Sequence, residues 1–259
     1  MRKKRIIILC SILSVFAVLI ILASTVFRLS KVQVNFLTTN MTVLSETDAK
    51  TIKDTGKFKT GGNILFMNFE KQKANIEKNV PYAKVVKIER KFPNKAVVHI
   101  SERTPAAIIN DGIVAYVLDS DLKVLKVVDI GSFDQNHLTS AEYNSPTLNG
   151  IEIEKTLTSG DFVNNTTAIG VVSCIESGLK SISYSIQDLS NINVSQENDQ
   201  THLTLHVRGN SLYLELDNIS SLKSQIQEGF TFYFAHLKQD GRQNGKITKV
   251  GTEWHFVAE

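Results

Sequence analysis

Cysteine is nearly absent from this sequence, and one of its two cysteines, Cys10, lies inside a long apolar run. Cys174 is therefore alone in the remainder of the chain, so no intrachain disulfide can connect its folded parts. A small scaffold held together by disulfides is excluded, and the fold has to depend on a hydrophobic core.

A basic surface is also missing. The chain has 29 basic and 26 acidic residues, a formal net charge of +3. Arg2, Lys3, Lys4 and Arg5 open the chain, so the remainder has 25 basic against 26 acidic side chains, a net charge of −1. We therefore expect no nucleic-acid binding. Only four prolines and 42% hydrophobic residues argue against disorder.

One long hydrophobic run is present, from Ile6 to Phe27, and it contains no charged residue. At ~1.5 Å per residue a helix over this run is ~33 Å long, enough to cross the hydrocarbon core of a bilayer. The alternative is a cleaved signal peptide, whose apolar core should be only ~7–15 residues long. We expect a cytoplasmic tail at 1–5, one transmembrane helix at 6–27 and an extracytoplasmic C-terminus.

The segment from Val32 to Arg103 predicts a small α+β domain. Alternating apolar residues indicate strands over 32–36, 84–92 and 96–100, with Val86 and Ile88 on one face of the second and Ala96, Val98 and Ile100 facing inward in the third. Helices are expected near 45–56 and 68–80, with Ser45 as the N-cap of the first. The order strand, helix, helix, strand, strand allows two helices to cover one face of a mixed sheet.

The remaining residues, 105–259, predict a mostly antiparallel β domain with flanking helices. Strands are expected over 113–118, 122–128, 182–186, 203–207, 212–216 and 247–257, and helices over 165–176 and 219–237. Asp119-Ser120-Asp121 and Arg208-Gly209-Asn210 indicate hairpin turns. Residues 129–165 are polar and are predicted as loops.

No pattern predicts catalytic residues, a metal site or a cofactor. His202 and His206 are four apart on a predicted strand, which separates them by ~13 Å, too far to share one ion. Asp119 and Asp121 are expected to form a turn. Cys174 has apolar neighbours and is expected to be a buried, unreactive thiol. A membrane-anchored extracytoplasmic cell-wall enzyme remains the alternative to a protein without enzymatic activity.

A dense series of motifs runs from Gly62 to Ala107: Asn63-Ile64-Leu65-Phe66, then Val86-Lys87-Ile88-Glu89-Arg90-Lys91-Phe92-Pro93, then Ser101-Glu102-Arg103-Thr104-Pro105-Ala106. This block resembles the FtsQ/DivIB family of bacterial cell-division proteins. The resemblance implies a POTRA domain over 28–104 and a β domain over 105–259, where Pro146-Thr147-Leu148-Asn149-Gly150 resembles a Pro-x-Leu-x-Gly turn. The motif residues assigned to the POTRA domain are Arg90, Pro93, Glu102, Arg103 and Pro105.

The resemblance also implies a function. Proteins of this family are membrane-anchored scaffolds of the divisome that bind single-pass coiled-coil partners of the FtsL/DivIC type. They help regulate septum formation and the septal peptidoglycan synthase machinery, and this chain would therefore sit in the cell membrane at the division septum.

Partners of this family are thought to add along an exposed strand edge of the β domain. Our candidate edge lies within Thr248–Val257 and comprises Val250, Thr252, Trp254 and Phe256. Two alternatives stay open here. Trp254 and Phe256 either fill the core or form a docking surface. Glu102-Arg103, expected to be exposed, is either a solvated strand end or a contact that fixes how the outer domains meet.

Overall fold

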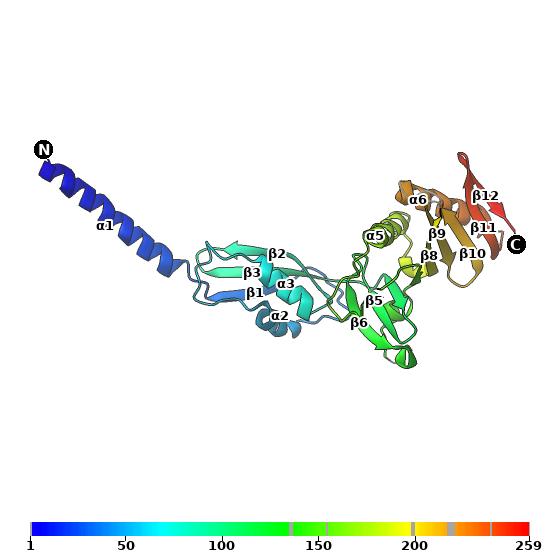
Figure 1. The fold of residues 1–259 in the computed structure, drawn as a ribbon, viewed down its shortest axis with the longest axis horizontal. Coiled ribbons are helices and arrows are strands. Elements are labelled where there is room, and N and C mark those ends of the chain that lie inside the picture. Colours follow the sequence, from blue (N-terminus) through cyan, green and yellow to red (C-terminus); the bar gives the residue numbers. More distant parts are fainter. Residues whose placement is uncertain are drawn as a thin grey trace. The chain divides into compact units, whose positions relative to one another are not determined.

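The computed structural model describes residues 2–134, 137–153, 155–197, 200–216, 221–238 and 240–258. The side chains of residues 2–10, 19, 22, 23, 166, 167, 197 and 200 are outside this description. The chain divides into two compact units, Met1–Arg103 and Thr104–Glu259 (Figure 1). The finer division into tail, span and two domains stays a prediction.

Helix α1 (Arg2–Val26) begins the chain (Figure 1). Its described apolar side chains are exposed, among them Ile12, Leu13 and Phe16 at 62%, 66% and 65%. In the part of the chain that the structure describes, no helix meets the length and apolar character required to cross a membrane. The span at 6–27 includes side chains outside that part, and it remains a prediction from the sequence.

After α1, the first unit has the predicted order of elements: β1 (Lys31–Phe36), α2 (Asp48–Gly56), α3 (Glu70–Asn79), β2 (Ala83–Lys91) and β3 (Lys95–Glu102). The sheet order is β1-β3-β2, with β1 parallel and β2 antiparallel to β3. Ile52 of α2 and Ile76 of α3 are fully buried, as are the predicted inward residues of β3, Ala96, Val98 and Ile100. The α+β prediction for this unit is confirmed.

Two local predictions for the first unit are wrong. Thr47, not Ser45, precedes the first residue of α2, and Ser45 instead donates its N–H and hydroxyl to Asp48 at 2.8 and 3.0 Å. Val86 is 52% exposed whereas Val85 is buried. The reason is a β-bulge at this point of β2, because one extra residue reverses the face to which the following residues point.

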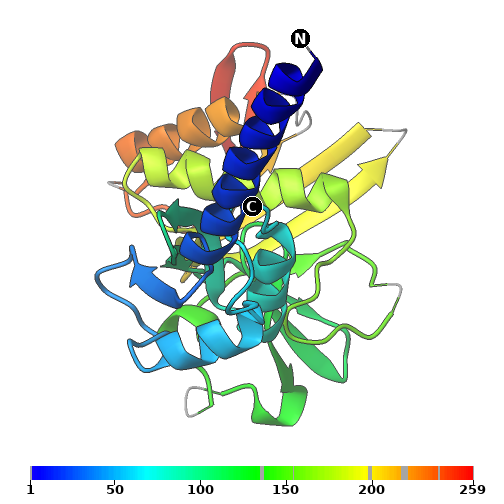
Figure 2. The ribbon, with the colours of Figure 1, turned by 90° about the vertical axis from the view of Figure 1, so that its left-hand side faces the viewer.

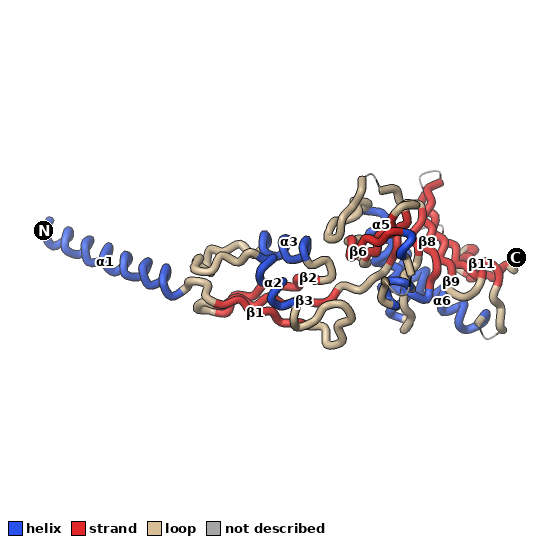
Figure 3. Tube along the Cα trace, turned by 90° about the horizontal axis from the view of Figure 1, so that it is seen from below, coloured by secondary structure: helices blue, strands red, loops and turns tan. Residues whose placement is uncertain are grey.

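The described strands of the second unit form one nine-stranded sheet in the order β12-β11-β10-β9-β8-β7-β4-β5-β6. Figure 3 draws the strands in red, with β6, β8, β9 and β11 labelled in this unit. Five of its eight neighbouring pairs are antiparallel and three are parallel, so the prediction of a mostly antiparallel domain is confirmed. The strands are β4 (Ala107–Asn110), β5 (Val114–Leu118), β6 (Val124–Asp129), β7 (Thr147–Asn149), β8 (Leu189–Glu197), β9 (Gln200–Val207), β10 (Ser211–Leu216), β11 (Asn244–Val250) and β12 (Glu253–Val257).

Helices α5 (Thr166–Ser181) and α6 (Leu222–Phe232) lie alongside each other and supply the flanking helices (Figure 2). A π-helical turn, η4 (Tyr233–Leu237), continues α6. Both helices bury apolar side chains in a core shared with the sheet: Val171, Val172, Ile175 and Leu179 from α5, and Leu222, Ile226 and Phe230 from α6. Residues 219 and 220, at the start of the predicted second helix, lie outside the described residues.

Several predictions for the second unit are wrong. The segment 182–186, expected as a strand, is instead the turn that follows α5 and leads into the short helix η2 (Ile186–Asp188). Strands β4 and β8 were not predicted, and the Pro146–Gly150 motif is no simple turn, because β7 lies within it between β4 and β8. The polar segment 129–165 also contains η1 (Ile130–Ser132) and α4 (Ser140–Tyr143). The single strand expected over 247–257 is two strands.

Candidate functional site

Strand β12 ends the nine-stranded sheet, so one of its edges has no neighbouring strand among the described residues. A two-residue turn, Gly251-Thr252, joins β12 to β11 and places Val250 opposite Glu253. The residues that flank such a turn form a hydrogen-bonded pair, and the pattern then alternates along the ladder. The backbone groups of Trp254 and Phe256 consequently point toward the free edge.

The two aromatic side chains of β12 are half-buried and pack against the core of the second unit. The Trp254 Nε1–H donates to Glu228 Oε2 of α6 at 3.3 Å, and Lys249 Nζ donates to the same oxygen at 2.7 Å. These hydrogen bonds, first that of Lys249 and then that of Trp254, hold the pKa of Glu228 below its ordinary value of 4.5. The rings thus attach the edge strand to the sheet and to α6, while the strand's backbone stays accessible.

The other two residues of the candidate edge lie elsewhere. Val250 ends β11 and is 63% exposed. Thr252 lies in the turn between β11 and β12 and is not part of a strand, so it lies outside the free edge of β12. Partner binding along β12 stays a prediction that these placements do not test.

Arg90, the first motif residue of the POTRA region, holds a loop in place. Its Nε donates to Ile64 O at 2.9 Å and its Nη2 to Met67 O at 2.6 Å. The guanidinium lies 4.9 Å from the centre of the Phe69 ring. Pro93 lies in the tight turn that connects β2 to β3.

Glu102 and Arg103 form separate contacts within the first unit. The Glu102 carboxylate accepts hydrogen bonds from Thr42 N at 2.9 Å, from Thr42 Oγ1 at 2.7 Å and from Val43 N at 2.8 Å. Arg103 is buried, and its Nη2 lies 3.7 Å from Glu77 Oε1. The expected exposure of the pair is therefore wrong for Arg103. Pro105, the last motif residue, is buried in the second unit.

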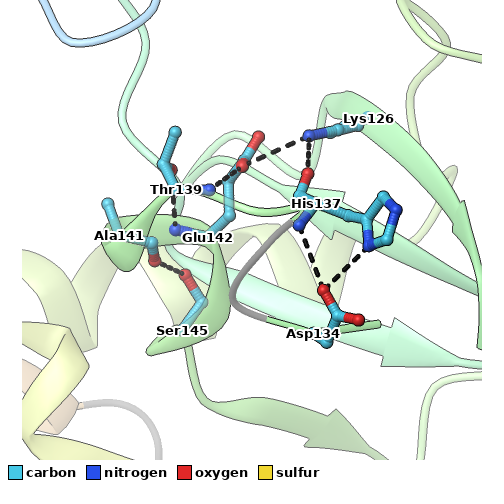
Figure 4. A network of polar contacts seen from close by, with 7 residues as sticks. All are labelled: Lys126, Asp134, His137, Thr139, Ala141, Glu142 and Ser145. Carbon is cyan, nitrogen blue, oxygen red and sulfur yellow. Dashed lines mark hydrogen bonds and ion pairs between the residues drawn. The ribbon is translucent and has the colours of Figure 1, made fainter. Parts of the chain in front are cut away.

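A polar network in the second unit combines a buried acid, an amine and an imidazole (Figure 4). Glu142 accepts from Thr139 N at 2.6 Å and lies 3.4 Å from Lys126 Nζ, which donates to His137 O at 2.8 Å. The His137 Nδ1 is 2.8 Å from Asp134 Oδ1, but both of these side chains are well exposed. The network attaches residues 137–145 to β6, and its residues include no activated nucleophile.

The remaining candidates for chemistry have structural roles. Asp119 Oδ1 accepts from the N–H groups of Asp121 and Lys123 at 3.0 and 2.8 Å, which confirms the turn prediction. His206 Nε2 lies 3.1 Å from Asn193 Nδ2, and burial lowers the pKa of His206. Cys174 is only half-buried, against the prediction, although it packs on the core. Within the described residues no group of three or more His, Cys, Asp or Glu could hold a metal ion.

Two neighbouring cavities of about 370 and 310 Å³ border the segment after β7. Their described lining contains one carboxylate, that of Glu152, which both share. Glycoside hydrolysis ordinarily uses a pair of carboxylates. The described lining therefore offers no positive support for a wall-cleaving enzyme.

The match to a known family model lies in the first unit. Residues 28–103 match the family model of the POTRA domain, FtsQ-type. The chain is 34% identical over 95 residues to the cell division protein DivIB of Clostridium tetani, covering 35% of this chain and 36% of that protein. It is 34% identical over 76 residues to DivIB of Clostridium acetobutylicum, covering 29% and 30%.

A third relative, DivIB of Clostridium botulinum strain Hall, is 44% identical over 52 residues, which cover 20% of each chain. The chain thus spans about a third or less of the length of the curated relatives it matches. The matched region coincides with the βααββ fold derived above. The resemblance of this chain to the FtsQ/DivIB family is therefore confirmed, and its residues 28–103 form a POTRA domain of the FtsQ type.

Proposed function

We propose that this chain is a membrane-anchored, non-enzymatic scaffold of the bacterial division machinery. The observation that carries the proposal is the FtsQ-type POTRA domain at 28–103, directly after the uncharged apolar run Ile6–Phe27. The named relatives are cell division proteins, which supports the same role here.

The anchor places the folded units outside the cytoplasmic membrane. Four basic residues precede the apolar run and favour a cytoplasmic N-terminus. Ile12, Leu13 and Phe16 of α1 are each more than half exposed, and lipid would cover such apolar side chains. The chain then acts in the cell membrane at the septum.

The scaffold's partners are single-pass division proteins of the FtsL/DivIC type, through which it helps regulate septum formation and the septal peptidoglycan synthase machinery. We place partner capture on the free edge of β12. An extended partner segment would pair with the backbone of Trp254 and Phe256, and its alternate side chains would supply selectivity.

Two substitutions at Phe256 distinguish the contribution of its backbone N–H to partner binding from that of its side chain. Phe256→Ala removes the ring and keeps the N–H, whereas Phe256→Pro removes both, and proline is tolerated on edge strands. We expect Phe256→Pro to bind the purified outer segment of an FtsL/DivIC-type partner more weakly than Phe256→Ala does. Equal binding by two folded variants would exclude this edge.

A depletion experiment tests the function as a whole. Cells depleted of the chain should form filaments without septa, and the unaltered chain should restore division. Normal division after depletion would refute the scaffold role. Release of wall fragments by the purified chain would instead support the alternative, an anchored cell-wall enzyme.

A further inference from the structure

The chain leaving α1 is bound to the loop that follows α2. The Ile64 N–H donates to Phe27 O and the Leu29 N–H donates to Gly62 O, both at 2.8 Å. An isolated β-bridge pairs Arg28 with Asn63 between these hydrogen bonds. The end of α1 and this loop of the POTRA domain therefore lie at the same end of the first unit.

Three large apolar side chains are exposed at this end. Phe66 is 85% exposed, Phe92 is 59% exposed and Leu65 is 39% exposed. We call Leu65, Phe66 and Phe92 the apolar tip. The Phe92 ring contacts Phe27 edge-to-face at 5.8 Å, and the backbone hydrogen bonds from Arg90 fix the loop that carries the other two. The tip is thus held in place beside the residue that ends the predicted span.

Three lysines lie in register at the same end of the sheet. Lys31 of β1 and Lys91 of β2 are both direct partners of Lys95 in the central strand. We call Lys31, Lys91 and Lys95 the lysine row; all three are exposed. Like charges directly opposite each other destabilise a sheet, and among the described residues Lys91 is the member of the row that forms an ion pair, with Glu89 at 2.7 Å.

The three segments around the tip are rich in basic residues, and the nearby Glu89 carboxylate, just outside them in the sequence, pairs with Lys91. Residues 24–36, 57–68 and 90–95 include seven basic side chains and no Asp or Glu: Arg28, Lys31, Lys57, Lys59, Arg90, Lys91 and Lys95. Exposed aromatic and aliphatic residues beside basic side chains match the interface of an anionic bilayer. There the apolar groups enter the acyl boundary while the cations contact phosphate.

We propose that the apolar tip and the lysine row dock the POTRA domain on the outer leaflet of the membrane that anchors the chain. The occupant of this surface is the anionic lipid headgroup layer. Docking would fix the orientation of the first unit relative to the bilayer. If the unit were held only by a flexible tether after α1, it could rotate relative to the membrane. The inference rests on the membrane anchor of the proposed function.

The experiment uses the full chain in nanodiscs and exploits its one tryptophan. In a Trp254→Phe background, tryptophan is introduced as Phe66→Trp or, for the matched control, Leu37→Trp. Leu37 is also exposed, at 49%, but follows the far end of β1, ~20 Å away at ~3.3 Å per residue. Circular dichroism checks that each variant is folded.

Quenching by lipids brominated near the headgroup is the readout. We expect strong quenching of the tryptophan at position 66 and little quenching of the tryptophan at position 37. At position 66 the quenching should be stronger in nanodiscs that contain phosphatidylglycerol than in nanodiscs of phosphatidylcholine alone. Lys95→Glu should lower the equilibrium constant for docking at least about fivefold, the effect of one basic residue at an anionic surface. Raised salt should act in the same direction.

The other outcomes overturn the proposal. Equal quenching at 66 and 37 in chains that remain inserted would refute docking and leave the anchor standing. A blue shift at 66 without bromine quenching would indicate a protein contact. Equal quenching in both lipid mixtures would exclude the lysine row. A chain that fails to insert into nanodiscs would refute the anchor together with the docking.

Discussion

Gly229 of α6 lies directly beneath Trp254 of the edge strand, and a Cβ atom at Gly229 would come within 3.0 Å of the Trp254 ring. The same atom would lie 2.7 Å from a methyl group of Leu214 in β10. The absence of a side chain at one helical position therefore allows α6, β10 and β12 to approach one another.

The first prediction concerns this contact. Gly229→Ala should destabilise the second unit by about 1–3 kcal/mol, because the added methyl overpacks a closed site. Gly170→Ala in α5 is the matched control, since nothing lies within 4 Å of its Cβ position. That change should stabilise by up to ~1 kcal/mol through helix propensity. Urea unfolding followed by Trp254 fluorescence measures both, and a neutral Gly229→Ala would contradict the close packing.

The second prediction is a pH dependence of the edge strand. The pKa of Glu228 is lowered in the folded chain, so the contribution of this carboxylate is present above its unfolded pKa and is lost as the pH falls through the folded value. Trp254 fluorescence should accordingly titrate with a midpoint below 4.5. Glu228→Gln should remove that transition, and a midpoint that survives the substitution would assign it to another group.

The third prediction explains the glycine of the Pro-x-Leu-x-Gly motif. Gly150 has φ +81°, and a Cβ there would lie 1.8 Å from Val194 O of β8. Gly112 has φ +91° with nothing within 4 Å, so Gly112→Ala should cost only the left-handed strain of about 1–2 kcal/mol. Gly150→Ala should lower the free energy of unfolding in urea by clearly more, because the backbone of β8 at Val194 must also move. Equal losses of unfolding free energy in the two variants would show that the backbone of β8 can move away from position 150 at little cost.

The fourth prediction concerns Glu102 in the POTRA domain. Glu102→Ala removes the acceptor of the Thr42 and Val43 N–H groups, and hydrogen bonds to charged acceptors contribute about 1.5–3 kcal/mol. Hydrogen exchange at these two amides should accelerate. Glu46→Ala, an exposed acid in the same unit, should leave their protection unchanged. Unaltered exchange in Glu102→Ala would mean that another acceptor replaces the carboxylate.

The POTRA domain was predictable because its signals are local. The alternation of Ala96, Val98 and Ile100 indicates a strand that is buried on one face. The turn at Pro93 marks the position at which β2 ends and β3 begins. Val86 was assigned to the wrong face because a bulge depends on the partner strand, which periodicity within β2 does not record.

In the second unit the sequence by itself determined the β5–β6 and β9–β10 hairpins, α5, α6 and the lack of disulfides. Tertiary structure decided that β7 lies between β4 and β8, that Gly150 touches Val194, and that β12 has no strand on its outer side among the described residues. Burial of one face of a helix or strand produces a periodic pattern of apolar residues in the sequence. Which strand lies next to another, in contrast, depends on backbone hydrogen bonds between residues that are distant in the sequence. Those bonds leave no side-chain pattern, so only the folded chain shows them.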